Sequence, residues 1–214
     1  VELTIDAALQ DIAQSELMRV VEKHAPKGAS IIISDPRTGY ILAMANYPSF
    51  DPNRYGDYPV DALKNRAVTD VFEPGSTFKI VAASGALNEQ IVTPTDRFNC
   101  ALTSVEYKGR TLRLPAEAHS MGVLQVSEIV SQSSNRGSAH LGMLLGEQRL
   151  YDYARAFGFG TRAGLGSAVE SPGVLHPVKK WDGLTITRLP MGHAVSATPL
   201  QVQQTLTAYL LPFA

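Results

Sequence analysis

In the stretch Glu73-Pro74-Gly75-Ser76-Thr77-Phe78-Lys79, a hydroxyl and an amine lie three residues apart, just after a Pro-Gly turn that predicts the start of a helix. Ser76 and Lys79 would then share one helical face. A serine is a weak nucleophile that needs a base, and a desolvated lysine that loses its proton can serve as one. The first helical turn also offers unpaired backbone N–H groups to an oxyanion. The pattern predicts an activated serine, although a solvated helix face produces the same spacing.

The residues after this motif favour catalysis. From Phe78 to Leu87 the chain is almost continuously apolar, which is typical of a helix that is buried on every side. A buried helix holds a nucleophile at its start in one place.

A second polar motif, Ser133-x-Asn135, lies between two apolar segments, 123–130 and 139–145, that are predicted to be helical. One interpretation is structural, because Ser and Asn cap and break helices. The other is functional, because two rigid helices would hold a hydroxyl and a carboxamide where they can shuttle a proton and orient Lys79.

These two motifs, in this order, resemble the signature of serine penicillin-binding proteins and serine β-lactamases. The flanking residues are similar to the class B (monofunctional) penicillin-binding proteins of the division or elongation type. Residues 65–72 are similar to their nucleophile region, 35–45 to their first hairpin, and 197–201 to the start of a late helix. The resemblance runs from Val1 to about Tyr209.

The resemblance implies an α+β fold of the penicillin-binding-protein and serine β-lactamase type, in which helices flank an antiparallel sheet. An all-helical lobe, roughly residues 80–160, would be inserted between strands, and residues 1–214 would form a single partial transpeptidase domain. Local patterns agree with this plan. They predict a helix from Asp6 to Pro26, a hairpin of central strands at 29–34 and 40–45, a short hairpin at 105–111, a helical block at 123–157, a loop at 164–181, and a helix capped by Thr198 with Pro199 at its first position.

The family's third motif, Lys-Thr-Gly on a central strand, is missing from this sequence. The similar tripeptide Arg37-Thr38-Gly39 lies in the predicted hairpin turn, and we interpret it as structural. In the family the missing strand follows the helix at Thr198-Pro199 and supplies an oxyanion-hole donor worth roughly 3–4 kcal/mol. We therefore expect a chain that is truncated before this motif and lacks the C-terminal strands.

By resemblance, the reaction is D,D-transpeptidation through a serine ester. Ser76 would attack the penultimate D-alanine carbonyl of a peptidoglycan stem peptide, and Lys79 would accept its proton. Ser133 would relay a proton to the leaving D-alanine. Asn135 would orient Lys79 and bind the substrate amide. β-Lactam antibiotics would acylate Ser76, and no metal or organic cofactor is expected.

Other functions stay open at this point. A D,D-carboxypeptidase or a β-lactamase would use the same residues and differ in whether water reaches the acyl-enzyme. A non-catalytic penicillin-binding sensor or scaffold, or a purely structural fragment, would fit the missing third motif. The resemblance also implies partners, namely a membrane glycan polymerase and divisome or elongasome proteins. It implies a periplasmic or extracytoplasmic place on the cytoplasmic membrane, with an N-terminal anchor helix outside this chain.

Composition disfavours several other classes of protein. With 44% hydrophobic residues, 18% charged residues and a formal net charge of −1, the 214-residue chain can bury a core and has no charge excess for nucleic acid. Cys100 is the only cysteine, so we predict no internal disulfide and a small buried side chain. The five histidines show no H-E-x-x-H spacing, so zinc is not expected.

Overall fold

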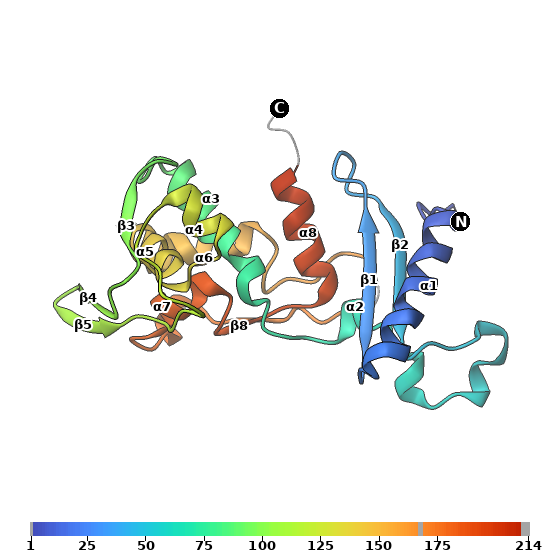
Figure 1. Ribbon diagram of the computed structural model, residues 1–214. Coiled ribbons are helices and arrows are strands. Elements are labelled where there is room, and N and C mark those ends of the chain that lie inside the picture. Colours follow the sequence, from blue (N-terminus) through green and yellow to red (C-terminus); the bar gives the residue numbers. More distant parts are fainter. Residues whose placement is uncertain (1, 167–168, 211–214) are drawn as a thin grey trace. The chain divides into compact units, whose positions relative to one another are not determined.

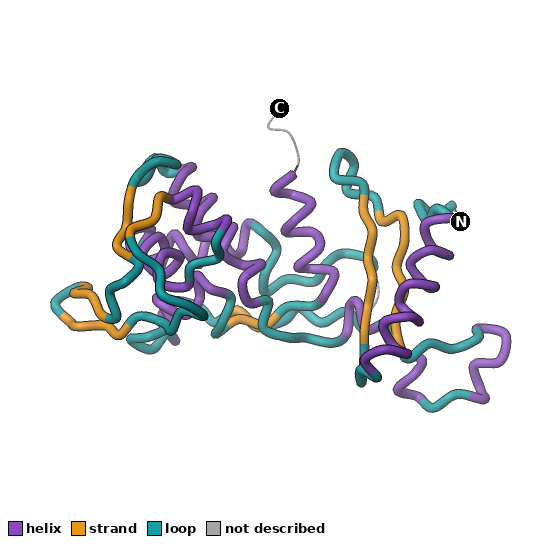
Figure 2. Tube along the Cα trace, in the orientation of Figure 1, coloured by secondary structure: helices purple, strands orange, loops and turns teal. Residues whose placement is uncertain are grey.

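The computed structural model describes residues 2–166 and 169–210, which divide into two compact units (Figure 1). The sheet unit comprises Val1–Phe72, Thr161–Pro172 and Ala197–Ala214, and the helical unit comprises Glu73–Gly160 and Gly173–Ser196. The helical unit contains the residues predicted for the inserted lobe, and Figure 2 shows its helices in purple with short strands between them. That a single domain covers 1–214 stays a prediction.

The sheet unit begins with the predicted helix and hairpin. Helix α1, Ala7–His24, starts after Asp6, whose carboxylate accepts a hydrogen bond from the Leu9 N–H at 2.9 Å. Strand β1, Ala29–Ser34, pairs antiparallel with strand β2, Ile41–Tyr47. Both predictions are confirmed.

Helix α1 packs on the hairpin and also covers one of its edges. Leu17 is buried against Ala43 and Ala45 of β2. The side chain of Gln10 takes the place of a neighbouring strand, since its Nε2 donates to the Met44 carbonyl at 3.1 Å and its Oε1 accepts from the Met44 N–H at 2.8 Å. An open strand edge invites unwanted pairing. Gln10 therefore satisfies the edge of β2 at Met44.

The strands are less buried than the central strands that were predicted. Every residue of β1 is half-buried, and in β2 only Ala43 and Ala45 are buried. The reason is that the sheet has two strands within residues 2–166 and 169–210, so β1 is contacted by helices α2 (Arg66–Thr69) and α8 (Pro199–Leu210) instead of a further strand. Within the described residues the two strands are therefore not central strands, whereas the predicted flanking of the hairpin by helices is confirmed by α1, α2 and α8.

Helix α8 begins as predicted, with Thr198 ahead of Pro199. The Thr198 hydroxyl accepts from the Gln201 N–H at 3.2 Å, and the Gln201 side chain accepts from the Thr198 N–H at 2.7 Å. This reciprocal pair is a capping box. Two 3-10 turns, η1 (Pro52–Asp57) and η2 (Val60–Leu63), complete the regular elements described in the sheet unit.

The helical unit combines helices with paired short strands. Strands β3 and β6, β4 and β5, and β7 and β8 form three antiparallel pairs. In chain order the elements are η3 (Gly75–Phe78), α3 (Lys79–Asn88), β3 (Arg97–Asn99), β4 (Ser104–Tyr107), β5 (Arg110–Arg113), β6 (Val123–Gln125), α4 (Val126–Ser131), α5 (Asn135–Leu145), α6 (Glu147–Ala156), β7 (Val174–Leu175), η4 (Val178–Lys180), α7 (Thr185–Arg188), η5 (Leu189–Met191) and β8 (Val195–Ser196).

The hairpin predicted at 105–111 is confirmed by β4 and β5, but two other predictions need correction. Residues 123–125, predicted to be helical, form strand β6. The helix starts only at Val126, because the Gln125 N–H donates to the Glu128 carboxylate at 2.7 Å and this contact ends the strand. The loop predicted at 164–181 contains the short strand β7 and the turn η4.

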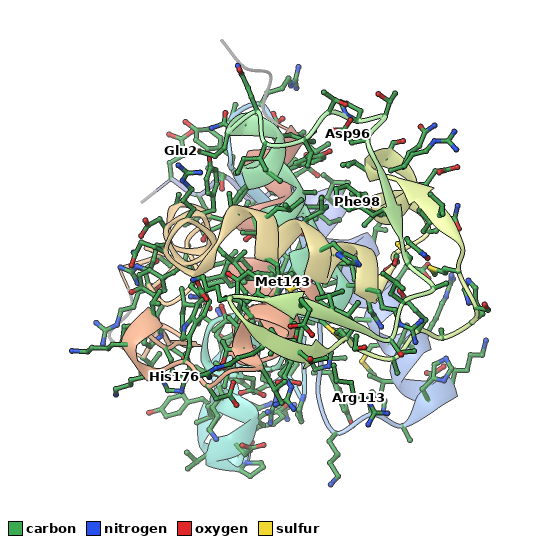
Figure 3. The ribbon with its side chains drawn as sticks, turned by 90° about the vertical axis from the view of Figure 1, so that its left-hand side faces the viewer. Glu2, Asp96, Phe98, Arg113, Met143 and His176 are labelled. Carbon is green, nitrogen blue, oxygen red and sulfur yellow. The ribbon has the colours of Figure 1, made fainter. Side chains whose placement is uncertain are left out.

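Helix α5 is central to the packing of the helical unit. Figure 3 labels Met143 on this helix and Phe98 on the neighbouring strand β3, where Phe98 stacks on His140 with ring centroids 5.9 Å apart. A Cβ at Gly137 would lie 2.5 Å from Ile129 of α4, so α4 and α5 approach closely and hold their connection at 132–134 in place. Cys100 is fully buried, as predicted.

Candidate active site

Ser76 lies in a 3-10 turn rather than in the first turn of an α-helix. Turn η3 covers Gly75–Phe78, and the N–H of Lys79, where α3 starts, donates to the Ser76 carbonyl. The predicted helix therefore begins at the Pro-Gly turn, but its first turn is 3-10 and the α-helix starts only at Lys79; Gly75 has a left-handed φ of 57°. In a 3-10 turn, side chains at i and i+3 eclipse. Ser76 and Lys79 therefore still share one side of the chain.

The two side chains differ in their access to solvent. Ser76 is exposed, whereas Lys79 is only 3% exposed. Within the described residues, the Ser76 hydroxyl makes no hydrogen bond. A substrate can therefore reach the hydroxyl while the amine beside it stays enclosed.

Lys79 and Ser133 meet, as the two motifs predicted. The Lys79 Nζ donates to the Ser133 Oγ at 2.8 Å and also to the Ser133 carbonyl oxygen. These residues are far apart in the sequence, so this contact depends on the packing of α3 against α4 and α5. The pair joins a buried amine to a hydroxyl that can pass on a proton.

Burial is the main influence on the Lys79 amine. It lowers the pKa of Lys79 below its ordinary value, because an ammonium is disfavoured away from water. The negative charge of Glu117 opposes this effect and raises the pKa of Lys79. The net shift is downward, which favours the neutral amine that a general base requires.

Ser133 occupies a strained position between α4 and α5. Its φ is 57°, in the left-handed region where glycine is normally found. The Ser133 N–H donates to the Val130 carbonyl at 3.1 Å, and the Ser134 N–H donates to the Ile129 carbonyl at 2.9 Å. These bonds form a Schellman motif that ends α4. The motif confirms the predicted connection between two helices and fixes the Ser133 backbone beside Lys79.

Asn135 is the first residue of α5. Its side-chain Nδ2 donates to the Ala116 carbonyl at 2.7 Å. Among the described residues, no hydrogen bond joins Asn135 to Lys79, so any orientation of the amine by this residue is indirect. The carboxamide is held by the chain segment that precedes β6.

Glu117 contacts Ser134 and the first residues of α5, and it was not predicted from the sequence. Its Oε1 accepts from the Ser134 hydroxyl at 2.7 Å and from the Arg136 N–H at 2.8 Å, and its Oε2 accepts from the Asn135 N–H at 3.0 Å. The polar stretch that contains Glu117 has no periodicity and carries no motif. A single sequence therefore has no local pattern that would predict a contact between Glu117 and the S-x-N motif.

The loop that contains Gly192 holds the nucleophile turn and was also missed. The Gly75 N–H donates to the Gly192 carbonyl at 3.1 Å, and the Glu73 carboxylate accepts from the Ala194 N–H at 3.2 Å. Gly192 has a φ of 79°, and a Cβ there would lie 2.0 Å from the Gly75 carbonyl oxygen. The two backbones approach so closely that only glycine fits. The presence of a glycine at position 192 was the feature of the sequence that could have indicated this close backbone contact.

A cavity of about 490 Å³ opens beside this loop. Its lining includes Glu73, Arg113, Pro115, Arg188 and His193. Its size lies in the range of small-molecule and peptide-group sites. Figure 3 labels Arg113, which ends strand β5 and leads into the segment that carries Glu117.

Across 2–166 and 169–210, no group of three or more His, Cys, Asp or Glu side chains is arranged to hold a metal ion. No helix in the same residues has the length and apolarity to cross a membrane. Arg37-Thr38-Gly39 lies in the turn between β1 and β2, as predicted.

The chain is similar to named bacterial proteins. It is 32% identical over 205 residues to the "Probable peptidoglycan D,D-transpeptidase PenA" of Neisseria flavescens, covering 96% of this chain and 50% of that protein. It is 35% identical over 206 residues to the "Penicillin-binding protein PbpB" of Mycobacterium tuberculosis, covering 94% of this chain and 30% of that protein. The chain thus spans half or less of the length of these curated relatives.

Solved structures show the same fold. Penicillin binding protein 3 of Mycobacterium tuberculosis, complexed with aztreonam, matches with a TM-score of 0.81 at 34% identity, covering 96% of this chain and 46% of that one. A peptidoglycan glycosyltransferase from Burkholderia ambifaria matches with a TM-score of 0.83 at 28% identity, covering 97% and 60%. Residues 29–210 match the protein family described as "Penicillin binding protein transpeptidase domain". The chain therefore belongs to the penicillin-binding protein transpeptidase family, and its α+β fold is of that type.

Proposed function

We propose that this chain catalyses D,D-transpeptidation of peptidoglycan stem peptides through an ester on Ser76, and that β-lactams acylate the same serine. One observation carries the proposal. Lys79 is buried, has a lowered pKa, bonds Ser133 and directly follows the turn that exposes Ser76. The relatives named above as a peptidoglycan D,D-transpeptidase and a penicillin-binding protein support the substrate and the inhibitor class.

The geometry of Lys79 suits a base in its neutral form. A neutral amine has two N–H donors and one lone pair, and both donors have acceptors in the Ser133 hydroxyl and carbonyl. The remaining position on Nζ carries the lone pair, which is available to the Ser76 hydroxyl proton. Ser133 thus selects the orientation in which Lys79 accepts a proton.

The reaction balances in two halves. Ser76 Oγ bonds to the penultimate D-alanine carbonyl carbon as its proton moves to Lys79. The bond to the terminal D-alanine nitrogen then breaks, and that nitrogen takes the proton through Ser133. In the second half an amine of a neighbouring stem attacks the ester, the new amide forms, and Ser76 recovers its proton. Asn135 would bind the substrate amide in both halves.

Penicillin labelling tests the nucleophile and the class of reaction. We expect mass spectrometry to show an adduct of one intact penicillin on the wild-type chain, persisting because water does not reach the ester. Ser76→Ala is the control and should give no adduct. Absence of an adduct on the wild-type chain, with the fold intact, would contradict the proposal.

The lifetime of the adduct separates the transpeptidase from a β-lactamase or carboxypeptidase. Both oxygens of Glu117 accept hydrogen bonds from Ser134 and α5, so this carboxylate is not a free base for water. This favours slow deacylation. Release of D-alanine from a stem peptide, with transfer to an added amine, separates an enzyme from a sensor or scaffold that only binds penicillin.

The cellular setting is part of the same proposal. We propose an extracytoplasmic place at the cytoplasmic membrane and contact with a membrane glycan polymerase and with divisome or elongasome proteins. The support is family membership. Fractionation and cross-linking in the source cell test both statements, and a cytosolic location would contradict them.

A further inference from the structure

Glu117 and its neighbours fasten one chain segment to the start of helix α5. Besides the three bonds to the Glu117 carboxylate, the Asn135 side chain donates to the Ala116 carbonyl at 2.7 Å. The Arg136 Nε donates to the Pro115 carbonyl at 3.1 Å. Every residue of the segment 115–117 is thereby tied to the S-x-N motif or to the residue after it.

These bonds also complete the cap of an 11-residue helix. The first N–H groups of a helix have no partner within it and need outside acceptors. Glu117 accepts from the N–H groups of Asn135 and Arg136, and Ser134, itself bonded to Glu117, accepts from the Gly137 N–H at 2.9 Å. A negative charge at this end of the helix is also favourable.

Ser133 is the residue that gains most from this cap. It sits between α4, which ends in the Schellman motif, and the capped start of α5, and its left-handed backbone needs support from both sides. We propose that Glu117 is a positioning residue for acyl transfer, because its carboxylate locks the start of α5 so that Ser133 stays bonded to Lys79 and Asn135 stays presented to substrate. This inference rests on the proposed function of the same site.

The charge of Glu117 adds a second, separable effect. Helix α3, which starts at Lys79, packs against η3, α4, α5, α6 and η5. The connection between α4 and α5 brings the Ser133 hydroxyl and carbonyl into contact with the Lys79 amine. The titratable residues of these elements are Glu128 of α4, Arg136 and His140 of α5, and Glu147, Arg149, Tyr151, Asp152, Tyr153 and Arg155 of α6. The charge that acts on the pKa of Lys79 is that of Glu117, which lies outside these elements. Glu117 raises the pKa of Lys79, so loss of its charge should lower it.

The test uses the pH dependence of penicillin acylation in single turnovers. Acylation should rise with pH as Lys79 loses its proton, and then reach a plateau. Glu117→Gln should lower the plateau about tenfold or more, because the site is misplaced, and should move the rising limb to lower pH. Ser134→Ala removes one anchor but no charge, so it should lower the plateau and leave the limb in place.

A matched control is Glu106→Gln, which removes a carboxylate from the exposed β4–β5 hairpin, where it bonds Thr111. This variant should leave both the plateau and the rising limb of the pH profile of acylation unchanged. Profiles of Glu117→Gln and Ser134→Ala that superimpose on the wild type would overturn the inference. If Glu117→Gln does not fold, an unchanged plateau in Ser134→Ala overturns it alone. Absence of any wild-type adduct would instead overturn the proposed function, so the two failures are distinct.

Discussion

Ser133 has an unfavourable backbone conformation, and its hydroxyl also contacts the Lys79 amine. A left-handed φ disfavours any residue with a Cβ, and glycine is the usual choice at the end of a Schellman motif. Here the position carries a hydroxyl that bonds Lys79 at 2.8 Å. The strain is thus located at a residue that the proposed reaction uses, and strained residues are common at functional sites.

This strain leads to a prediction with two variants. Ser133→Ala and Ser133→Gly both remove the hydroxyl, so both should lose most penicillin acylation. The two variants differ in how well the new residue tolerates the left-handed φ. Ser133→Gly should be more stable than Ser133→Ala by about 1 kcal/mol, because glycine adopts the left-handed conformation freely. Chemical denaturation and single-turnover acylation check the two halves. Equal stabilities would show that Ser133 is not strained.

Ser76 is expected to matter for chemistry and little for stability. It is exposed, and within the described residues its hydroxyl makes no hydrogen bond. Ser76→Ala should abolish the covalent adduct and change the free energy of unfolding by less than about 0.5 kcal/mol, as is usual for exposed positions. Mass spectrometry and denaturation measure these quantities. An adduct that persists in this variant would place the nucleophile elsewhere.

At the scale of elements, the nucleophile turn depends on a second loop that is distant in the sequence. The Gly75 N–H bonds the Gly192 carbonyl, and the space for a side chain at Gly192 is filled by Gly75 backbone. Backbone atoms cannot move aside as the end of a flexible side chain can. The position of η3 is therefore set by η5 and the loop that follows it.

Gly192→Ala should disturb this contact directly. The new Cβ would lie 2.0 Å from the Gly75 carbonyl oxygen, and the φ of 79° is unfavourable for alanine. We expect acylation to fall about tenfold or more as Ser76 is displaced, with a stability loss of about 1–3 kcal/mol. The control is Gly183→Ala, where a Cβ meets nothing within 4 Å. A Gly192→Ala variant that acylates at the wild-type rate would contradict this account.

Features that depend on residues close together in the sequence could be predicted from it, whereas contacts between distant segments could not. Ser76, Lys79 and Ser133 could be proposed from the sequence because short motifs report local spacing, and the predicted meeting of Lys79 and Ser133 is observed. Glu117 was missed because its contact with α5 depends on the path of an aperiodic segment. The strand at 123–125 was missed for a similar reason, since its partner β3 gives no local pattern.

At the scale of the whole molecule, each of the two compact units has its own buried cluster. In the sheet unit Leu17 packs with Ala13, Ala43 and Ala45, and in the helical unit Leu141 of α5 belongs to a separate cluster. Ser76, Lys79, Glu117, Ser133 and Asn135 all lie in the helical unit. The residues proposed for acylation therefore lie in the same unit as the cluster that contains Leu141.

This arrangement predicts that stability and acylation respond differently to core substitutions in the two units. Leu17→Ala and Leu141→Ala each remove a buried leucine side chain and should each cost about 2–5 kcal/mol of stability. At a temperature where both variants are folded, Leu17→Ala should acylate at the wild-type rate. Leu141→Ala should acylate more slowly, because α5 carries Asn135 and anchors Ser133. Circular dichroism gives the temperature range in which each variant is folded, and single-turnover penicillin labelling gives the acylation rate. Equal slowing in both variants would show that the sheet unit also controls the geometry of Ser76 and Lys79.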